Sequence, residues 1–269
     1  MKSLRVGLIV LLTAVVVFGL LGPWLPVGSA TAPAGRPFAP PGPGHPFGTD
    51  FLGRDMLARL ADGGRMMLLQ AIGATVAGSV VGISVGTLTG LSTTPVTRVM
   101  LRVVDGLSAL PPLLVLLVLA TGTPGNEVVV AVAIAAVSIP FSVRAVHAAT
   151  RDVVRQPYVA IARARGDGPL RIVRYDVLPN ILEVVGAEAG IRFIAAAQFA
   201  ATAGFLGLGA SAPAANWGRL VRENLPGLDL NPAALLVPAA LLVALAVAVT
   251  AFVDRFAAGP ATLARVVPR

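Results

Sequence analysis

Residues 156–180 read QPYVAIARARGDGPLRIVRYDVLPN, a polar and arginine-rich stretch between two long apolar runs. Pro157 suits the first position of a helix, because an N–H group would have no helical partner there. Gly166 suits the left-handed residue that closes a helix at its C-terminus. The pattern therefore predicts a short helix over residues 158–165.

A second short helix is expected after the turn at Asp167-Gly168. Pro169 begins it, and Leu178-Pro179 is expected to end it, because proline disfavours helix in the residue before it. Two readings of the whole stretch remain open. It is either a helix-turn-helix that lies flat on a membrane face and docks a soluble partner, or a solvated basic loop held at the surface by anionic lipid.

The composition indicates a multispan membrane protein. Hydrophobic residues make up 56% of the chain and charged residues only 13%, and the mean hydropathy is +0.83. Cysteine is absent, which excludes disulfides, thiolate metal sites and a cysteine nucleophile. The formal charge of +8 comes largely from arginines at the ends of apolar runs, a pattern of membrane topology rather than of nucleic-acid binding.

We expect an all-α membrane protein with six transmembrane helices, since about 20 apolar residues cross a hydrocarbon core. The expected spans are roughly residues 6–22, 66–90, 99–121, 128–146, 181–209 and 233–253. Basic residues then gather on one side, which places both termini in the cytoplasm. The chain forms a single domain, residues 1–269. Its expected parts are an N-terminal span with an external loop (1–65), a five-helix core (66–255) and a cytoplasmic tail (256–269).

The first span could also be read as a secretory signal peptide, with ATA at residues 30–32 as the cleavage match. Pro33 directly follows that match, and the match lies well beyond the apolar run, so a retained transmembrane helix is favoured. Residues 23–46 are rich in proline, glycine and alanine and carry almost no charge. They predict an extended external loop and not a packed domain.

Two patterns inside the expected spans predict helix contacts. Gly78, Gly82, Gly86 and Gly90 recur every fourth residue and predict a close seam with another helix. Glu188 and Arg192 lie one turn apart with the acid first, the favourable order for a helical ion pair. They either line a pathway through the membrane or form a structural pair at the interface with a second membrane subunit.

The 156–180 stretch resembles the signature of bacterial ABC-importer permeases, in which E-A-A, a later glycine and L-P form the helix that docks on the ATPase subunit. Ala160-Ile161-Ala162 stands at the E-A-A positions, so Ala160 replaces the glutamate and one acidic contact is lost. The resemblance implies a cytoplasmic coupling helix between the fourth and fifth spans. The implied ATPase-coupling residues are Tyr158, Ala160, Ala162, Arg163, Gly166, Asp167, Leu178 and Pro179.

Three further stretches are similar to permeases of the dipeptide, oligopeptide and nickel class, and they suit its DppC/OppC-like subunit. They are HPFGTD at 45–50 with GRD at 53–55, RVVD at 102–105 with ALP at 109–111, and FLGLG at 205–209 with NWG at 216–218. The family often carries an acid shortly before FLGLG, where this chain has Ala200, Ala201 and Thr202.

The first of these stretches has two readings, a set of structural turn formers or an ordered external cap near the pathway mouth, and the structural reading is favoured. Its residues are His45, Gly48, Asp50, Gly53, Arg54 and Asp55. No metal site is expected, because no second histidine or acid stands at ligand spacing from His45.

The resemblance implies a non-catalytic permease subunit for peptide uptake, in a bacterial plasma membrane. The implied partners are a homologous second permease, two ATPase subunits, an external substrate-binding protein, the peptide substrate and membrane lipid, with no nucleic acid. Lys2 is the only lysine in the chain, so it cannot supply the P-loop lysine of a Walker A site. We expect no cofactor in this chain, and ATP bound by the partner subunits.

Other function classes stay open as alternatives. An ion- or proton-coupled secondary transporter would need ionisable residues near the bilayer midplane, for which Asp105 and the Glu188–Arg192 pair are the candidates. An ABC permease for nickel or another non-peptide solute would share the same motifs. A membrane hydrolase is disfavoured, because His45 and His147 fall on opposite sides of the membrane in this topology.

Overall fold

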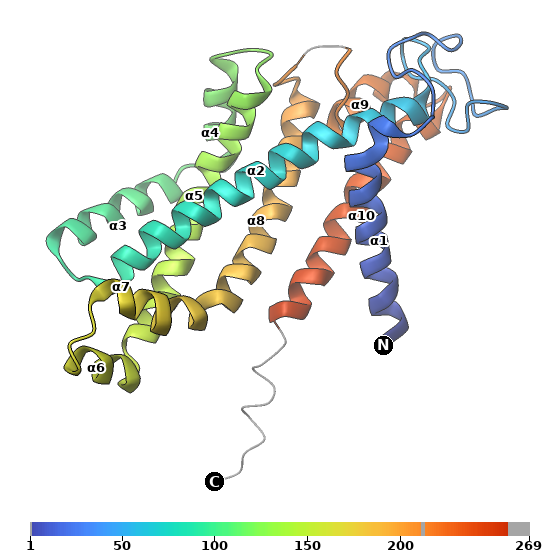
Figure 1. Cartoon of the computed structure of the whole chain (residues 1–269). Helices are drawn as coiled ribbons and strands as arrows, with labels where there is room; N and C mark the ends of the chain where they lie inside the picture. The colour runs from blue at the N-terminus through green and yellow to red at the C-terminus, as the bar shows by residue number, and fades with distance from the viewer. Residues whose placement is uncertain (1, 211–212, 258–269) are drawn as a thin grey trace.

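A computed structural model describes residues 2–210 and 213–257 of the chain (Figure 1). This part is helical with no named β-strand, so the all-α prediction is confirmed. Of the predicted C-terminal tail, residues 258–269 lie outside the described residues.

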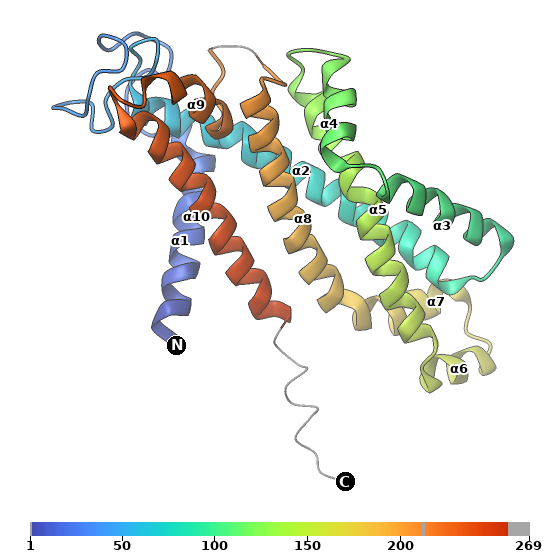
Figure 2. The ribbon, with the colours of Figure 1, turned by 180° about the vertical axis from the view of Figure 1, so that it is seen from behind.

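Five long helices form the body of the fold. They are α1 (Lys2–Leu21), α2 (Met56–Leu91), α5 (Glu127–Val154), α8 (Leu178–Leu206) and α10 (Pro232–Ala257). The shorter helices are α3 (Pro95–Ser108), α4 (Pro112–Thr121), α6 (Pro157–Ala164), α7 (Pro169–Ile172) and α9 (Trp217–Asn224). Helix α2 runs obliquely across the others, and α6 and α7 lie at the opposite end of the molecule from α9 (Figures 1 and 2).

Four of the described helices are long and apolar enough to cross a membrane, and a fifth span is possible if α3 and α4 are counted as one. The four are α2, α5, the run from α7 through α8, and α10. Helix α1 forms where the first span is expected, although its described apolar stretch, Ile9–Trp24, is shorter than a span.

In the region of the third span predicted over residues 99–121, the structure has two helices. They are α3 and α4, which are bent by 85° at the intervening break. Pro111 lies in that break and Pro112 begins α4, and both explain the bend, because proline lacks the N–H donor and disfavours helix in the residue before it. Helix α3 is left largely exposed.

The prediction that Leu178-Pro179 ends the second short helix is also wrong. Residues Pro169–Leu206 form one continuous helical run of 38 residues. A π-turn at Val173–Val177 precedes Pro179 and provides the wider turn that a proline ring needs. The Asn180 side-chain amide donates a hydrogen bond of 2.7 Å to the Asp176 carbonyl, which keeps that carbonyl paired.

The predicted glycine seam is present between α2 and α5, which make the most extensive helix–helix contact in the described chain. A Cβ atom added to Gly82 would lie 2.7 Å from the Cβ of Ser142, and one added to Gly90 would lie 2.5 Å from the Cβ of Thr150. Gly86 meets Val146 at 2.7 Å in the same way. The glycines thus allow the two helices to approach almost backbone to backbone.

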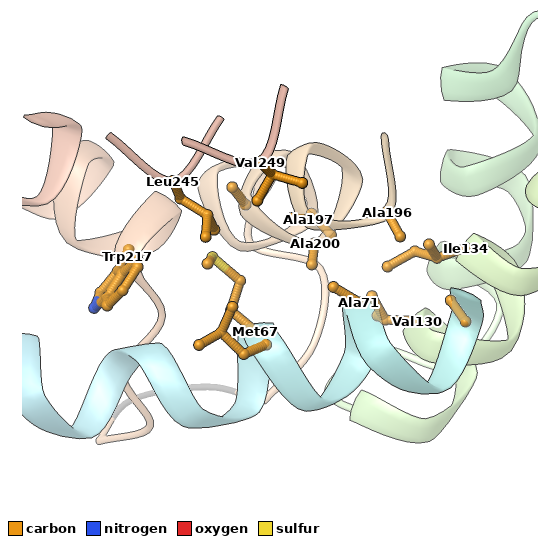
Figure 3. Packing of buried hydrophobic residues seen from close by; sticks show 14 of the residues in the cluster. Met67, Ala71, Val130, Ile134, Ala196, Ala197, Ala200, Trp217, Leu245 and Val249 are labelled. Carbon is orange, nitrogen blue, oxygen red and sulfur yellow. The ribbon is translucent and has the colours of Figure 1, made fainter. Parts of the chain in front are cut away.

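The main hydrophobic core lies where α2 passes beneath α5, α8, α9 and α10 (Figure 3). Trp217 from α9 is fully buried there, and its ring stacks on Phe18 of α1 with centroids 6.5 Å apart. The Trp217 indole N–H donates to the Leu60 carbonyl at 2.8 Å, so the one polar atom of the ring is satisfied. Asn216 begins α9, since its Oδ1 accepts a hydrogen bond from the Gly218 N–H at 2.8 Å.

The external loop is more ordered than the predicted extended segment. It contains no helix after Trp24, yet isolated β-bridges join Pro33 to Arg54 and Thr49 to Asp55. Asn231, at the entrance to α10, donates from its side-chain amide to the Thr49 carbonyl at 3.1 Å. The loop therefore folds back as a cap over the ends of α2 and α10, although its composition alone predicts an open chain.

The glycine seam of α2 can be tested by comparing two glycine substitutions on that helix. Replacing Gly82 with alanine should lower stability by about 1–3 kcal/mol, because the new methyl group overlaps Ser142. Gly73 lies on the same helix with open space around it, so Gly73→Ala should be neutral or stabilising by up to about 1 kcal/mol. Thermal unfolding of both variants in detergent measures the difference. Equal melting temperatures would contradict the seam.

Candidate functional site

Helix α6 ends in a Schellman motif, the arrangement predicted at Gly166. The Asp167 N–H donates to the Ala162 carbonyl at 3.1 Å, and the Gly166 N–H donates to the Arg163 carbonyl at 3.0 Å. Gly166 has φ of 84°, in the left-handed region that favours glycine. The chain therefore reverses tightly between α6 and α7.

One face of this reversal is anchored in a second hydrophobic cluster. Val159 and Ala162 of α6 pack there with Ile172 of α7, Val177 of the π-turn and Ile181 of α8. Val146 of α5 completes the buried part of the cluster, and Leu178 packs against its edge. The segment is thus held on the ends of α5 and α8 by apolar contacts.

The other face of the reversal exposes large apolar and aromatic side chains beside arginines. Tyr158 is 41% exposed, Ile161 is 58% exposed and Leu170 is 80% exposed. Arg163, Arg165 and Arg171 are exposed on the same segment. An apolar patch edged by charge is typical of a protein interface. We call Tyr158, Ile161 and Leu170 the outer patch.

The predicted coupling residues divide between these two faces. Tyr158, Ala160, Arg163, Gly166 and Pro179 are exposed, whereas Ala162 is buried and Asp167 and Leu178 are partly buried.

Asp167 joins the two arms of the reversal. Its carboxylate lies 3.4 Å from the Arg165 guanidinium and 3.3 Å from that of Arg171. It therefore links the end of α6 to α7.

At the opposite end of the molecule, Asp50 is the centre of a buried charge network. Its carboxylate pairs with Arg54 at 2.7 Å and with Arg59 at 3.4 Å, and all three side chains are almost fully buried. Arg59 also pairs with Glu223 of α9 at 3.0 Å. The network ties the external loop to α2 and α9.

The other residues of the external motif shape the loop around this network. Asp55 caps α2 by accepting a hydrogen bond from the Ala58 N–H at 3.0 Å, and His45 Nδ1 contacts its second carboxylate oxygen. Gly53 has φ of 77°, and a Cβ on it would lie 2.2 Å from the Gly35 carbonyl oxygen. Gly48 has φ of 67° and is equally confined. Every contact of the motif is thus one of capping, turning or pairing.

Glu188 and Arg192 form an ion pair of 2.9 Å with both side chains largely buried, 14% and 17% exposed. Glu188 accepts a hydrogen bond from Ser142 at 3.4 Å, and the Arg192 guanidinium lies over the Phe141 ring at 5.1 Å. Both partners belong to α5 of the same chain. The pair therefore sits between α8 and α5.

Sequence reasoning missed Glu127, whose side chain joins the start of α5 to α2 and to the loop after α8. Its carboxylate accepts hydrogen bonds from the side-chain amide of Gln70 on α2 and, at 2.7 Å, from the Ala210 N–H after α8. The only local signal is an acid in the first turn of an apolar helix. That signal predicts the start of a helix, but it does not identify the hydrogen-bond partners of the Glu127 carboxylate.

Within residues 2–210 and 213–257, no three histidine or acidic side chains gather into a group that could hold a metal ion. His147 is held instead by a hydrogen bond of 3.1 Å between its Nδ1 and the Thr89 hydroxyl.

The fold and these two ends define a helical, multi-pass membrane protein with an ordered cap at one end and an exposed, arginine-rich segment at the other. Comparison with known proteins gives the family: residues 67–260 match the binding-protein-dependent transport system inner membrane component family. The chain belongs to this family and is an inner-membrane permease of the ABC transporter type.

Several relatives are peptide permeases. The chain is 34% identical over 203 residues to the di/tripeptide transport system permease protein DppC of Pseudomonas aeruginosa, covering 71% of this chain and 67% of that protein. It is 33% identical over 255 residues to a putative peptide transport system permease of Brucella suis, covering 88% and 83%. A probable D,D-dipeptide transport system permease, DdpC of Escherichia coli, is 30% identical over 221 residues, covering 82% and 74%.

Solved structures share the fold. A chain of the MetNI methionine ABC transporter, determined in inward-facing conformations, superposes with a TM-score of 0.62 at 22% sequence identity. The match covers 74% of this chain and 95% of that chain. A second crystal form of the same transporter gives a TM-score of 0.57, again at 22% identity, with 71% and 90% covered.

We expect a single substitution in the charge network around Asp50 to lower stability strongly. Asp50→Asn removes the negative charge between Arg54 and Arg59 and should lower stability by about 3–5 kcal/mol, because it leaves buried guanidinium groups uncompensated. Asp229→Asn, an exposed change on the same side, should stay within about 0.5 kcal/mol. Thermal unfolding in detergent compares the two. A loss no larger than that of the control would refute the network's role.

The Schellman turn predicts a local effect. Gly166→Ala should destabilise the end of α6 by about 1 kcal/mol, because alanine resists a positive φ although nothing crowds the site. Gly168 is equally uncrowded but has φ of −71°, so Gly168→Ala should be nearly neutral. Hydrogen exchange of α6 should be about fivefold faster in the first variant alone. Equal rates in both variants would show that the turn does not depend on the left-handed residue.

Proposed function

We propose that this chain is one of two homologous permease subunits of an ABC importer for peptides, in the plasma membrane of a bacterium. Two ATPase subunits bind its cytoplasmic face, and a substrate-binding protein delivers the peptide from outside. The peptide assignment is supported by the relatives, which include di/tripeptide and D,D-dipeptide permeases at 30–34% identity. The chain itself catalyses no reaction and needs no cofactor.

The proposed topology has six spans with both termini in the cytoplasm. It counts α1 as the first span and the bent α3–α4 pair as the third, beside the four helices that are long enough alone. The arginine-rich α6–α7 segment then lies in the cytoplasm, as the excess of basic residues there favours. The ordered cap of residues 25–55 lies outside, where a binding protein would approach.

The outer patch is the observation that carries the proposal. Tyr158, Ile161 and Leu170 are exposed on a segment whose opposite face is buried in an apolar cluster. A merely solvated basic loop would need neither the anchor nor the exposed aromatic and aliphatic groups. A soluble ATPase subunit that covers this patch would move the segment as a unit.

The proposed role of the segment is to pass motion from the ATPases to the membrane spans. Closure of the ATPase subunits around ATP shifts α6 and α7, and the continuous helix from α7 into α8 carries the shift across the membrane as a rigid-body change. Nucleotide binding belongs to the partners, because the only lysine of this chain is Lys2.

The Glu188–Arg192 pair is proposed to stabilise the packing of α8 on α5. Its contacts with Ser142 and Phe141 of the same chain support this role over one at the permease interface or in direct contact with substrate. A self-neutralised pair also avoids the free energy of leaving a lone charge within a span.

The docking surface can be tested by reversing its polarity. The double variant Ile161→Asp and Leu170→Asp should reduce co-purification of the ATPase subunits at least tenfold, because it places two carboxylates in an apolar contact. Leu228→Asp is a matched control, since it adds a carboxylate at an exposed leucine beyond α9. Wild-type retention of ATPases by the double variant would remove the coupling assignment.

Uptake into vesicles tests the cargo and the energy source separately. ATP inside vesicles that hold the complete transporter should drive accumulation of labelled dipeptide, and the double variant should abolish it. Accumulation of nickel or of another solute in place of peptide would overturn the peptide assignment alone. Uptake that follows an ion gradient without ATPases would overturn the whole proposal.

A further inference from the structure

A cavity of about 500 Å³ lies at the end of the molecule that carries α6 and α7, between the ends of α2 and α5 and the first turns of α3. Three arginines are among the residues that line it. Arg98 comes from α3, Arg151 and Arg155 come from the end of α5, and Asp152 is the only acid that lines it. Ser92, from the α2–α3 connection, adds a hydroxyl group.

Three arginines that line this cavity are without a carboxylate partner among the described residues. Within the described part of the chain, no carboxylate lies within ion-pairing distance of Arg98, Arg151 or Arg155. Their neighbour Arg144, by contrast, is paired with Asp105 at 2.9 Å. The guanidinium N–H donors of the three arginines are therefore free to bind an anion.

Helix α3 places this cavity at the level of lipid headgroups. Its exposed apolar side chains include Val96, Val99, Val103 and Leu107, while Arg98 and Arg102 lie between them. Helix α3 begins at Pro95 as the first half of the bent third span, so its first turns lie at the cytoplasmic interface in the proposed topology. Since α3 also forms part of the cavity wall, the cavity opens close to that interface.

We propose that this cavity binds the phosphate group of an anionic phospholipid from the inner leaflet. Phosphate oxygens accept paired hydrogen bonds from guanidinium groups, the geometry for which arginine is better suited than lysine. The volume accommodates a glycerophosphate headgroup. A lipid held there would clamp the α2–α3 connection to the end of α5, directly beside α6. The proposal concerns the membrane and is independent of the cargo.

Lipid retention by the purified full-length chain tests the site. We would exchange the protein into nanodiscs of phosphatidylcholine with increasing phosphatidylglycerol and measure bound lipid by native mass spectrometry after release. Arg98→Gln with Arg151→Gln should weaken phosphatidylglycerol binding about thirtyfold, whereas Arg102→Gln with Arg174→Gln, which removes the same charge outside the cavity, should change it less than threefold. Size-exclusion chromatography verifies that each variant is folded.

Three outcomes are informative. Selective loss in the cavity variant, with partial recovery when Arg98 and Arg151 are replaced by lysine, supports the site. Equal retention by all variants overturns it. Thermal stabilisation by soluble glycerol phosphate or inorganic phosphate that equals the effect of phosphatidylglycerol supports an anion site but overturns the lipid as its source.

Discussion

The close approach of α2 and α5 is the constraint on which the other helices depend. Glycines at every fourth position of α2 bring its backbone against Ser142, Val146 and Thr150 of α5, and α8 packs on both helices. In a membrane the hydrophobic effect does not drive helices together, so close packing over a long contact supplies much of the attraction. Helix α2 runs obliquely along this contact from the cap toward the end of the molecule that carries α6 and α7 (Figure 1).

The two ends of the fold are held by opposite kinds of interaction. At one end, Asp50, Arg59 and Glu223 fix the cap through buried ion pairs, which require mutual geometry and tolerate little displacement. At the other end, Val159, Ile172 and their neighbours hold α6 and α7 through apolar contacts, which are non-directional. The cap is therefore expected to tolerate less movement than the α6–α7 segment.

Features set by neighbouring residues were predicted from the sequence, whereas contacts between residues far apart in the sequence were not. The helix at residues 157–164, its cap at Gly166 and the seam on α2 follow from patterns within a few residues of one another. Pro111 and Pro112 also signalled the bend in the sequence, but residues 99–121 were assigned to one span because most of the stretch is apolar. Arg59 with Glu223, 164 positions apart, and Gln70 with Glu127, 57 positions apart, could not be paired without the fold. The segment of α6 and α7 was thus predicted as a motif, and the cap's charge network was not.

The unbroken helical run from Pro169 to Leu206 has a mechanical consequence. Within it, the 29 residues of α8 span about 44 Å at ~1.5 Å per residue, from the π-turn to the loop that meets Glu127. A helix of that length acts as a lever: a tilt of about 5° at its lower end displaces its upper end by about 4 Å. The π-turn at Val173–Val177 lies between α7 and α8. A movement of α6 and α7 would have to pass through this turn to reach α8. The stiffness of the π-turn would therefore set how much of a movement of α6 and α7 reaches the other end of α8.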